Sequence, residues 1–342
     1  MYPVLRKLLF SLEPETAHDF SLECLGAAER LKLLSLFTPS VEDSPVELLG
    51  LTFSNAIGLS AGLDKNGDYF NALGQLGFGF VEIGTVTPEP QAGNPKPRMF
   101  RLAEHEAIIN RMGFNNKGVD YLVDRVKNRR FDGILGINIG KNKVTAEEDA
   151  LSDYEIAMEK VYPYADYITV NISSPNTPGL RNLQFGDSLD RLLEGLAIKQ
   201  VQLSEQHGRR VPVLIKIAPD MNEEEVAGIS KTFLKHKVDG VIATNTTLDK
   251  SAVSDSPHAE EMGGLSGAPL ALQSTLVIKQ LRTHLGSEMP IIGVGGIQQG
   301  SDAIEKLAAG ANLVQVYSGF IYRGPALITD LRKAVAAHHS LI

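Results

Sequence analysis

The sequence predicts a (β/α)₈ barrel, the TIM-barrel α/β fold, preceded by an N-terminal helical extension. From about residue 55 onward, eight short runs of β-type residues alternate with longer stretches of helical periodicity. Several runs are almost continuously apolar, as parallel strands are when helices cover both faces of their sheet. No GxGxxG turn follows any of them, so the doubly wound open sheet that binds dinucleotides is the second choice.

The strands and helices of the barrel can be assigned to residue ranges. The expected strands are, in chain order, Asn55–Ser60, Phe80–Thr85, Ile134–Ile139, Asp166–Asn171, Val211–Ile217, Gly240–Thr244, Pro290–Val294 and Leu313–Tyr317. The helices between them include Asp187–Gln206, Asn222–His236 and Ser301–Ala309, and each begins with a residue type that caps helix N-termini. We therefore assign residues 41–342 to one barrel domain and residues 1–40 to the extension.

The extension has a pattern of two helices, expected at Pro3–Ser11 and Glu15–Leu36. Side chains at helical spacing in the second helix are Phe20, Cys24, Ala28, Leu31 and Leu34. One interpretation is a helix that packs on the barrel and closes its bottom, which the periodicity alone favours. The other is a helical hairpin that faces lipid. Four basic and five acidic residues up to Phe37 give neither interpretation electrostatic support.

Composition excludes several classes of protein. The formal net charge of −8 argues against general nucleic-acid binding, which requires a basic face. The single cysteine, Cys24, excludes an intrachain disulfide and is consistent with a reducing compartment. The eight histidines do not cluster, so we expect no metal site. No segment has the apolar length that spans a bilayer, and we expect no signal peptide.

Glycine-rich turns follow the last two strands. Gly295-Gly296 comes after the seventh strand, and Tyr317-Ser318-Gly319 comes after the eighth. Barrels often bind a phosphate at this place, with backbone N–H groups and a helix N-terminus as donors. A third glycine-rich turn, Gly263–Gly267, can contribute. The glycines would also fit tight turns without a ligand, but their place at these two strand ends favours a phosphate site.

A group of asparagines forms a second set of candidates: Asn110, Asn171, Asn176 and Asn245. Each amide offers a donor and an acceptor side by side. This pair of groups matches a neutral ring with adjacent N–H and C=O groups, such as a pyrimidine. A single asparagine is more often a turn or cap residue, but several that converge from different strand ends favour a binding site.

Three further residues have unusual positions. Lys216 lies in the apolar run VPVLIKIAP, where it either points into the barrel and stabilises negative charge on a cofactor, or pairs with an acid on a helix. Glu82, inside FVEIG, is explained only by a structural ion pair. Ser174 follows the fourth strand, and no strand end offers a carboxylate pair, histidine or cysteine as a better proton acceptor. A free serine is a poor base, so it needs an activated substrate proton.

Nine motifs in order resemble the dihydroorotate dehydrogenase family. They are SAGLDKNG, INRMGFNN, GINIGKN, NISSPNTPGLR, IKIAPD, ATNTT, GGLSG, GVGGI and VQVYSG. The resemblance covers essentially the whole chain. The N-terminal helices and the serine in NISSPNTPG are similar to class 2 of this family, whose members are quinone-dependent and membrane-associated.

The resemblance implies one FMN per chain, with its phosphate in the turns at Gly296 and Tyr317-Ser318. The implied cofactor-binding residues are Ala61, Gly62, Leu63, Asp64, Lys65, Thr85, Asn138, Asn171, Lys216, Thr244, Gly267, Gly296, Tyr317 and Ser318. The implied residues for dihydroorotate are Lys65, Asn110, Arg111, Met112, Gly113, Phe114, Asn171, Asn176, Asn245 and Thr246. Ser174 is implied as the catalytic base.

A mechanism and partners also follow from the resemblance. Ser174 takes the proton at C5 of (S)-dihydroorotate, a hydride passes from C6 to N5 of FMN, and Lys216 stabilises the reduced flavin. The proton leaves through Thr177 and water, and a membrane quinone accepts the electrons. Orotate then serves UMP synthesis.

We expect a monomer bound peripherally to the cytoplasmic face of the cell membrane through residues 1–40. The side chains expected to face lipid are Leu8, Leu9, Phe10, Leu33, Leu34 and Phe37.

Two alternatives remain at this point. A soluble class 1 dihydroorotate dehydrogenase, which uses fumarate or NAD, resembles this chain but has a cysteine as base, whereas this sequence has Ser174 and its only cysteine is Cys24. An RNA-modifying flavoenzyme similar to tRNA-dihydrouridine synthase would need a basic face and a catalytic cysteine. The sequence has neither feature.

Overall fold

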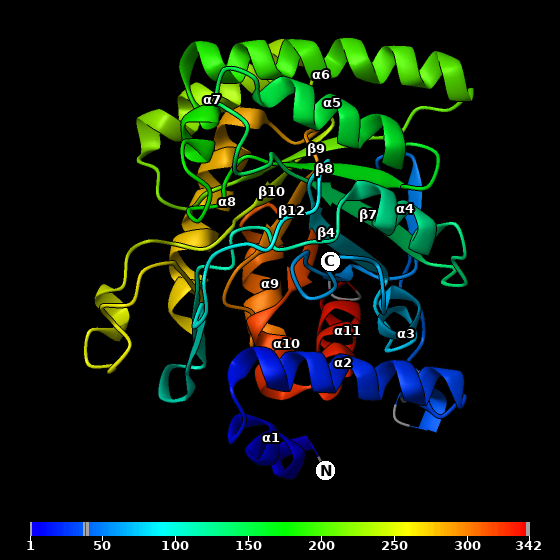
Figure 1. Ribbon diagram of the computed structural model, residues 1–342, viewed down its shortest axis with the longest axis vertical. Coiled ribbons are helices and arrows are strands. Elements are labelled where there is room, and N and C mark those ends of the chain that lie inside the picture. The colour runs from blue at the N-terminus through cyan, green and yellow to red at the C-terminus, as the bar shows by residue number, and fades with distance from the viewer. Residues whose placement is uncertain (1, 37, 39–40, 340–342) are drawn as a thin grey trace.

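A computed structural model describes residues 2–36, 38 and 41–339, and its centre is a closed barrel (Figure 1). Eight strands, all paired in parallel, follow one another around the barrel in chain order. They are β3 (Ile57–Leu59), β4 (Phe80–Val86), β7 (Ile134–Ile139), β8 (Tyr167–Asn171), β9 (Val213–Ile217), β10 (Gly240–Ala243), β12 (Ile291–Val294) and β13 (Leu313–Val316). Each lies within or overlaps the range expected from the sequence, so the predicted barrel is confirmed.

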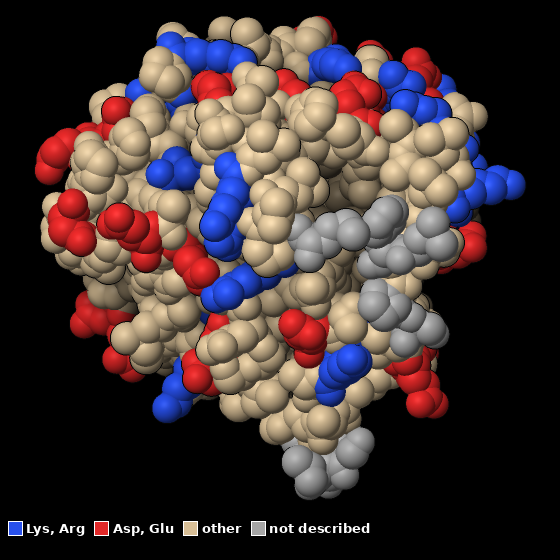
Figure 2. All heavy atoms as spheres, turned by 90° about the horizontal axis from the view of Figure 1, so that it is seen from below, with Lys and Arg blue, Asp and Glu red and all other residues tan. Residues whose placement is uncertain are grey.

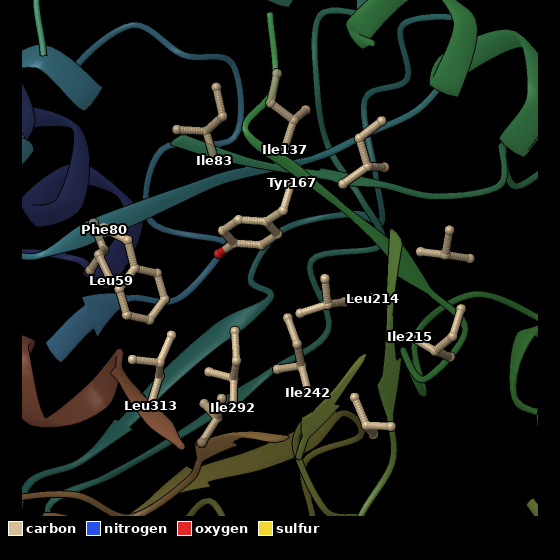
Figure 3. Close-up of a cluster of buried hydrophobic side chains, with 14 of the residues drawn as sticks. Leu59, Phe80, Ile83, Ile137, Tyr167, Leu214, Ile215, Ile242, Ile292 and Leu313 are labelled. Carbon is tan, nitrogen blue, oxygen red and sulfur yellow. The ribbon is translucent and has the colours of Figure 1, made fainter. Parts of the chain in front are cut away.

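Aromatic rings fill the barrel interior. The ring of Tyr167 lies near the middle of the buried cluster, and the ring of Phe80 lies to one side of it, with centroids 6.4 Å apart (Figure 3). The neighbouring strands make room for them with glycines: a Cβ at Gly58 would lie 2.3 Å from the Phe80 ring, and one at Gly136 would lie 2.2 Å from the Tyr167 ring. An alanine at either position would therefore overlap with a side chain that has no space to move.

Helices surround the barrel and follow its strands. They are α3 (Phe70–Gly74), α4 (Val119–Val126), α5 (Ala150–Val161), α6 (Gly186–His207), α7 (Glu223–His236), α8 (Ala271–Leu285), α9 (Gly300–Ala308), α10 (Ser318–Arg323) and α11 (Ala326–His339). Single 3₁₀ turns lie at Leu34–Leu36, Ala103–His105, Leu180–Gln184, Ser251–Val253 and Ala268–Leu270.

The predicted helix caps are correct in one case of three. Asn222 caps α7, because its side chain accepts from the N–H of Glu225, whose carboxylate accepts from the N–H of Asn222 in return. Asp187 and Ser301 are wrong as caps, since α6 and α9 begin one residue earlier and both residues lie in the first turn. At α9 the capping pair is Gln299 and Asp302.

Five short strands were not expected from the sequence. β1 (Val46–Leu48) and β2 (Leu51–Phe53) form an antiparallel hairpin. β5 (Met99–Leu102) and β6 (Ala107–Asn110), in the connection after β4, join β11 (Gly264–Gly267), from the connection after β10, in a separate three-stranded sheet. These strands have only three or four residues each, which is too short for an alternating pattern to be recognised.

The N-terminal helices differ from the expectation in length and in their buried face. α1 spans Tyr2–Phe10 and α2 spans Pro14–Arg30, so the helix expected to reach Leu36 ends six residues earlier. α2 buries Glu15, Ala17, Leu22 and Gly26. The predicted packing stripe is wrong for most of its members: Phe20, Cys24 and Leu31 are exposed, whereas Ala28 is half-buried against the core and Leu34, beyond the helix, is buried.

The two helices do not close the bottom of the barrel. α1 packs on α10, and α2 packs on α3 and β5, so both lie beside elements that follow the carboxyl ends of strands (Figure 1). The amino ends are covered instead by the β1–β2 hairpin, where the ring of Phe53 meets that of Phe80 at 5.2 Å. Among the described residues, no helix combines the length and the apolar composition required to cross a membrane.

Candidate active site

A cavity of about 1000 Å³, including its mouth, opens at the carboxyl ends of the barrel strands. It brings together most of the residues selected from the sequence. These are Ala61, Gly62, Lys65, Thr85, Asn110, Met112, Gly113, Phe114, Asn171, Ser174, Asn176, Lys216, Thr244, Asn245, Thr246, Gly267, Gly296, Tyr317 and Ser318. The amide group and the glycine turns, proposed separately from the sequence, therefore line one space.

Four of the selected residues lie outside the cavity wall. Leu63 is buried, and the carboxylate of Asp64 accepts from the N–H groups of Asp68 and Tyr69, while burial raises its pKa to about 6. The side chain of Asn138 lies beneath Thr85, to which it is hydrogen-bonded at 2.6 Å. Arg111 forms an ion pair with Glu261 at 2.7 Å.

Several lining residues were not singled out from the sequence. They are Ser60, Pro175, Ser266, Leu270, Val294, Ile297, Gln315 and Val316. Of these residues, Gln315 could have been selected from the sequence. An uncharged polar residue inside the apolar strand β13 is expected to point at a polar partner. The others are small or apolar residues whose types carry no signal of binding.

The glycine turns form a place for an anion. Gly296 has φ of +73°, and a Cβ there would lie 2.4 Å from Cα of Ala271, so α8 begins directly against the turn. The N–H groups of Gly295 and Gly296 donate no hydrogen bond to any described residue. Ser318 and Gly319 open α10, where backbone N–H groups lack an intrahelical acceptor. Unpaired donors that line a cavity fit a phosphate group.

The charge of the cavity also suits anionic ligands. Among the described residues that line it, the only charged side chains are Lys65 and Lys216. Burial and, to a smaller extent, the nearby Arg98 lower the pKa of Lys65 to about 8 against the opposing effect of acidic neighbours. Lys216 donates to Oγ of Ser60 at 3.0 Å; burial lowers its pKa, and Glu82 raises it. One buried and one half-buried lysine in the cavity of a protein with a net charge of −8 indicate a ligand that carries negative charge.

The asparagines are held in fixed orientations. Asn171 donates through Nδ2 to Oγ1 of Thr85 at 3.0 Å, and its Oδ1 accepts from the hydroxyl of Ser173 at 3.0 Å. Asn245 donates to Oγ of Ser173 at 3.0 Å. Asn176 donates to the carbonyl of Asn110 at 3.1 Å. Contacts within the protein therefore hold the side-chain amides of Asn171, Asn176 and Asn245, which lowers the entropic cost of binding.

Two buried polar atoms of residues that line the cavity, Oγ1 of Thr246 and Oε1 of Gln315, have no partner among the described residues. Oγ1 of Thr246 is buried and makes no hydrogen bond with any described residue. β11 passes close by, since a Cβ at Gly264 would lie 1.9 Å from this oxygen. A buried hydroxyl that faces a cavity and lacks a partner is a ready donor for a polar ligand.

Ser174 lies in a loop that is held from several sides. Its Oγ accepts from the N–H of Asn176 at 3.2 Å, and the side chain is almost fully buried. Arg181, the last residue of NISSPNTPGLR, donates to the carbonyls of Ser173 and Thr246 and forms an ion pair with Asp220 at 2.7 Å. No sequence pattern indicates the roles of Arg181 and Asp220, because their pairing depends on the three-dimensional fold.

The fold and this cavity are those of a (β/α)₈ barrel enzyme, with glycine turns that fit a phosphate and a cluster of amides that fits a small polar molecule. The chain belongs to the dihydroorotate dehydrogenase family, whose family model matches residues 44–338. The resemblance inferred from the motifs is thereby confirmed.

Individual relatives agree with this family and with its quinone-dependent class. A protein named dihydroorotate dehydrogenase (quinone) from Teredinibacter turnerae is 64% identical over 337 residues, which cover 98% of this chain and 99% of the relative. One of the same name from Saccharophagus degradans is 60% identical with the same coverage. The crystal structure of an Eimeria tenella DHODH with ferulenol matches with a TM-score of 0.87 and 35% identity, over 98% of this chain and 95% of that one. The names of the two relatives favour class 2 over the class 1 and RNA-modifying alternatives.

Proposed function

We propose that the protein oxidises (S)-dihydroorotate to orotate with FMN as its cofactor and a membrane quinone as electron acceptor, a step of UMP synthesis. The observation that carries the proposal is the cavity, in which two lysines are the only charged groups among the described lining residues and face a set of fixed amides. Dihydroorotate carries one carboxylate on a neutral ring of amide groups, and FMN carries a phosphate. The negative charges of both molecules match the two lysines of the cavity wall, and the ring of dihydroorotate matches its amides.

FMN is proposed to lie with its phosphate in the turns at Gly296 and Tyr317-Ser318, where unpaired backbone donors and tight turns fit an anion. When bound, FMN supplies the acceptor for a hydride. Lys216 stabilises the negative charge of the cofactor, because its ammonium group is buried and has only one neutral hydrogen-bond partner among the described residues. One FMN per chain is expected, since the cavity joins both sub-sites.

Dihydroorotate is proposed to bind with its carboxylate at Lys65 and its ring amides at Asn110, Asn171, Asn176 and Asn245. Fixed amides hold the ring in one orientation, and this places its acidic C–H beside the base at low entropic cost. Ser174 removes that proton. Oγ1 of Thr177, which is buried and without a described partner, is the next group proposed to receive it.

The test of the proposed function is a mixture of the purified holoenzyme and dihydroorotate without oxygen. We expect the flavin absorbance to bleach and to return when a quinone is added. No bleaching with an enzyme that carries its full flavin content would contradict the proposal. Bleaching without reoxidation by quinone would contradict the electron acceptor alone.

Replacing Lys216 with Ala is expected to slow flavin reduction by ~10²–10³-fold or to release FMN, because a buried positive charge next to the cofactor is lost. Lys216→Arg should not restore the parent behaviour, since a planar guanidinium does not fit the space of an ammonium group. Flavin content after gel filtration and stopped-flow reduction measure the two effects. A variant with parent values in both would show that Lys216 is only structural.

We propose that α1 and α2 form the membrane contact and the quinone entrance, at the cytoplasmic face of the cell membrane. The expected lipid-facing set needs correction. Leu9 and Leu34 are buried, the ring of Phe10 packs on Tyr322, and Phe37 lies outside the described residues. The exposed apolar side chains of this region are Val4, Leu5, Leu8, Leu12, Phe20, Leu31 and Leu33.

The charges around this face do not form a field of one sign. Figure 2 shows the molecule from below the view of Figure 1, with acidic and basic side chains separated by broad uncharged areas. The proposed membrane contact therefore depends on apolar burial rather than on attraction to anionic lipid.

The double variant Val4→Ser/Leu8→Ser is expected to weaken liposome binding by about tenfold per side chain, because burial of each is worth roughly 1.5–3 kcal/mol at most. Quinone reduction should fall far more than reduction of a water-soluble dye, and flavin reduction by dihydroorotate should persist. Val4 and Leu8 are 75% and 63% exposed, so the fold should tolerate the change. Leu272→Ser on α8, at a position 72% exposed, is the matched control. If the double variant lost quinone reduction and dye reduction equally, or if Leu272→Ser had the same effect, the proposal that α1 and α2 form the quinone entrance would be contradicted.

A further inference from the structure

Glu82 is the only acidic residue in the eight described barrel strands, and Lys216 is the only basic one. The Glu82 carboxylate is fully buried. It accepts three hydrogen bonds from three other strands: from Nδ2 of Asn138 at 2.8 Å, from the hydroxyl of Tyr167 at 3.0 Å, and from Nε2 of Gln315 at 2.9 Å. The structural ion pair expected for Glu82 is wrong, since no described cationic group lies within salt-bridge distance.

These contacts set the orientation of the Asn138 amide. Both carboxylate oxygens of Glu82 act as acceptors in these contacts, so Asn138 turns its NH₂ group toward Glu82 and its Oδ1 away from it. Oδ1 then accepts from the hydroxyl of Thr85 at 2.6 Å. With its proton used in this way, Oγ1 of Thr85 can only accept from its other neighbour, and it does so from Nδ2 of Asn171 at 3.0 Å.

The same direction continues to the cavity wall. Because Nδ2 of Asn171 is turned toward Thr85, its Oδ1 is available to accept from the hydroxyl of Ser173 at 3.0 Å. The oxygen of Ser173 in turn accepts from Nδ2 of Asn245 at 3.0 Å. Each donor in this series points back toward the Glu82 carboxylate. Asn171 and Asn245 both line the cavity, so the groups that they present to a ligand depend on a charge beneath the wall.

Glu82 also acts on the buried lysine of the barrel. The ammonium of Lys216 has only Oγ of Ser60 as a hydrogen-bond partner among the described residues, and Glu82 is the one acid that raises its pKa against the effect of burial. Tyr167 donates to the carboxylate and accepts from Nε2 of Gln315 at 3.3 Å; burial and Glu82 both raise its pKa, so its hydroxyl keeps its proton.

We propose that Glu82 is a positioning residue, whose carboxylate fixes the direction of the hydrogen-bond chain through Asn138, Thr85 and Asn171 and thereby the way in which Asn171 and Asn245 receive the ring of the substrate. This inference rests on the proposed function, in which those two asparagines hold dihydroorotate and orotate. Glu82 does not touch the ligand, and acts only through the amides above it.

Glu82→Gln tests this role, because glutamine keeps the shape of the side chain but replaces one acceptor with a donor. The NH₂ group of the new glutamine and the NH₂ group of Asn138 are then both donors that compete for the same acceptors. The hydrogen-bond chain therefore loses its single direction. We expect orotate to bind the oxidised holoenzyme about ten- to a hundredfold more weakly, as a buried group without its partner costs ~1–3 kcal/mol. The change of flavin absorbance on addition of orotate measures this without turnover.

Two further variants separate positioning from a purely structural role. Tyr167→Phe removes one donor from the same carboxylate but leaves the chain intact, so orotate binding should change less than about threefold. In Glu82→Gln/Asn138→Asp the acid and the amide exchange places, and the introduced aspartate accepts both from the introduced glutamine and from Thr85. The hydrogen bonds from Thr85 onward then regain their parent direction. Most of the lost affinity for orotate should therefore return.

The outcomes are distinguishable. Parent affinity for orotate in Glu82→Gln, equal losses in Glu82→Gln and Tyr167→Phe, or no recovery in the folded double variant would overturn the role of Glu82. If Glu82→Gln does not fold, the double variant is compared directly with Tyr167→Phe, and the proposal requires near-parent binding in both. A parent holoenzyme that neither binds orotate nor bleaches with dihydroorotate would instead refute the proposed function.

Discussion

Replacing Ser174 with Ala is expected to slow flavin reduction by dihydroorotate by ~10²–10⁴-fold while FMN stays bound, which is the usual contribution of a general base. Ser174 lines the cavity, and no carboxylate, histidine or cysteine is among the described residues that line it with Ser174. The loss of one hydroxyl changes neither the glycine turns nor Lys216. Anaerobic stopped-flow reduction and the flavin content of the purified variant measure the two quantities.

Ser174→Cys provides the control for this substitution. A thiol has nearly the same shape as a hydroxyl and loses its proton more easily, so part of the rate should return. Orotate should bind both variants with an affinity close to that of the parent, since Ser174 is not one of the amides that hold the ring. An alanine variant that reduces its flavin at the parent rate would show that the proton goes to another group.

The second large effect is expected for Glu15→Gln, which should lower the free energy of unfolding by ~3–5 kcal/mol. Arg98 donates to both carboxylate oxygens of Glu15, with the shortest distance 2.8 Å, and both side chains are only 8% exposed. Without the Glu15 carboxylate, the guanidinium of Arg98 remains charged and buried. Among the described residues, no other equally buried acid forms an ion pair with it. Lys96 also approaches Glu15, at 3.5 Å, but it is largely exposed.

The control for Glu15→Gln lies in the same helix. Glu29 pairs with Arg130, whose side chain is 65% exposed, so Glu29→Gln should change stability by at most ~1 kcal/mol. Urea unfolding of both variants, followed by circular dichroism, gives the comparison. Equal effects of the two substitutions would mean that the Glu15–Arg98 pair contributes no more than a surface ion pair.

This ion pair also connects the extension with the substrate side of the cavity. Arg98 donates to the carbonyls of Ala92 and Asn94, and Nδ2 of Asn94 donates to the carbonyl of Arg111 at 2.9 Å. Deletion of residues 1–38 would therefore remove a buried counter-ion as well as the proposed quinone entrance. Substitutions on the exposed face of α1 separate these two effects, which a truncation cannot.

The sequence was sufficient for the barrel because its strands are buried on both faces. Runs such as ILGINI and GVIAT have no solvent face, so their apolar character is continuous and their ends can be located. The residues at those ends were brought into one cavity by the closure of the barrel alone. This is why Asn171, Lys216 and Tyr317 were found without any knowledge of distances.

The parts that were missed depend on contacts between segments far apart in the chain. The Glu82 carboxylate is explained only when Tyr167 and Gln315 are seen beside it, and they are 85 and 233 residues away. The buried face of α2 was misassigned for a similar reason. Periodicity shows that a helix has an apolar side, but Glu15 is buried because Arg98 is there to receive it.

The small sheet outside the barrel ties two parts of the cavity wall together. β6 pairs with β5 on one side and with β11 on the other, and Ile109 lies opposite both Phe100 and Leu265. The wall segments that carry Asn110 and Gly267 thus belong to one hydrogen-bonded unit, although they come from connections more than 150 residues apart. Local opening of such a unit is cooperative, so the amide protons of both segments should exchange with solvent at one common free energy. We therefore expect a ligand that touches either segment to slow exchange in both, so that the two wall segments respond to it as one unit rather than as separate loops.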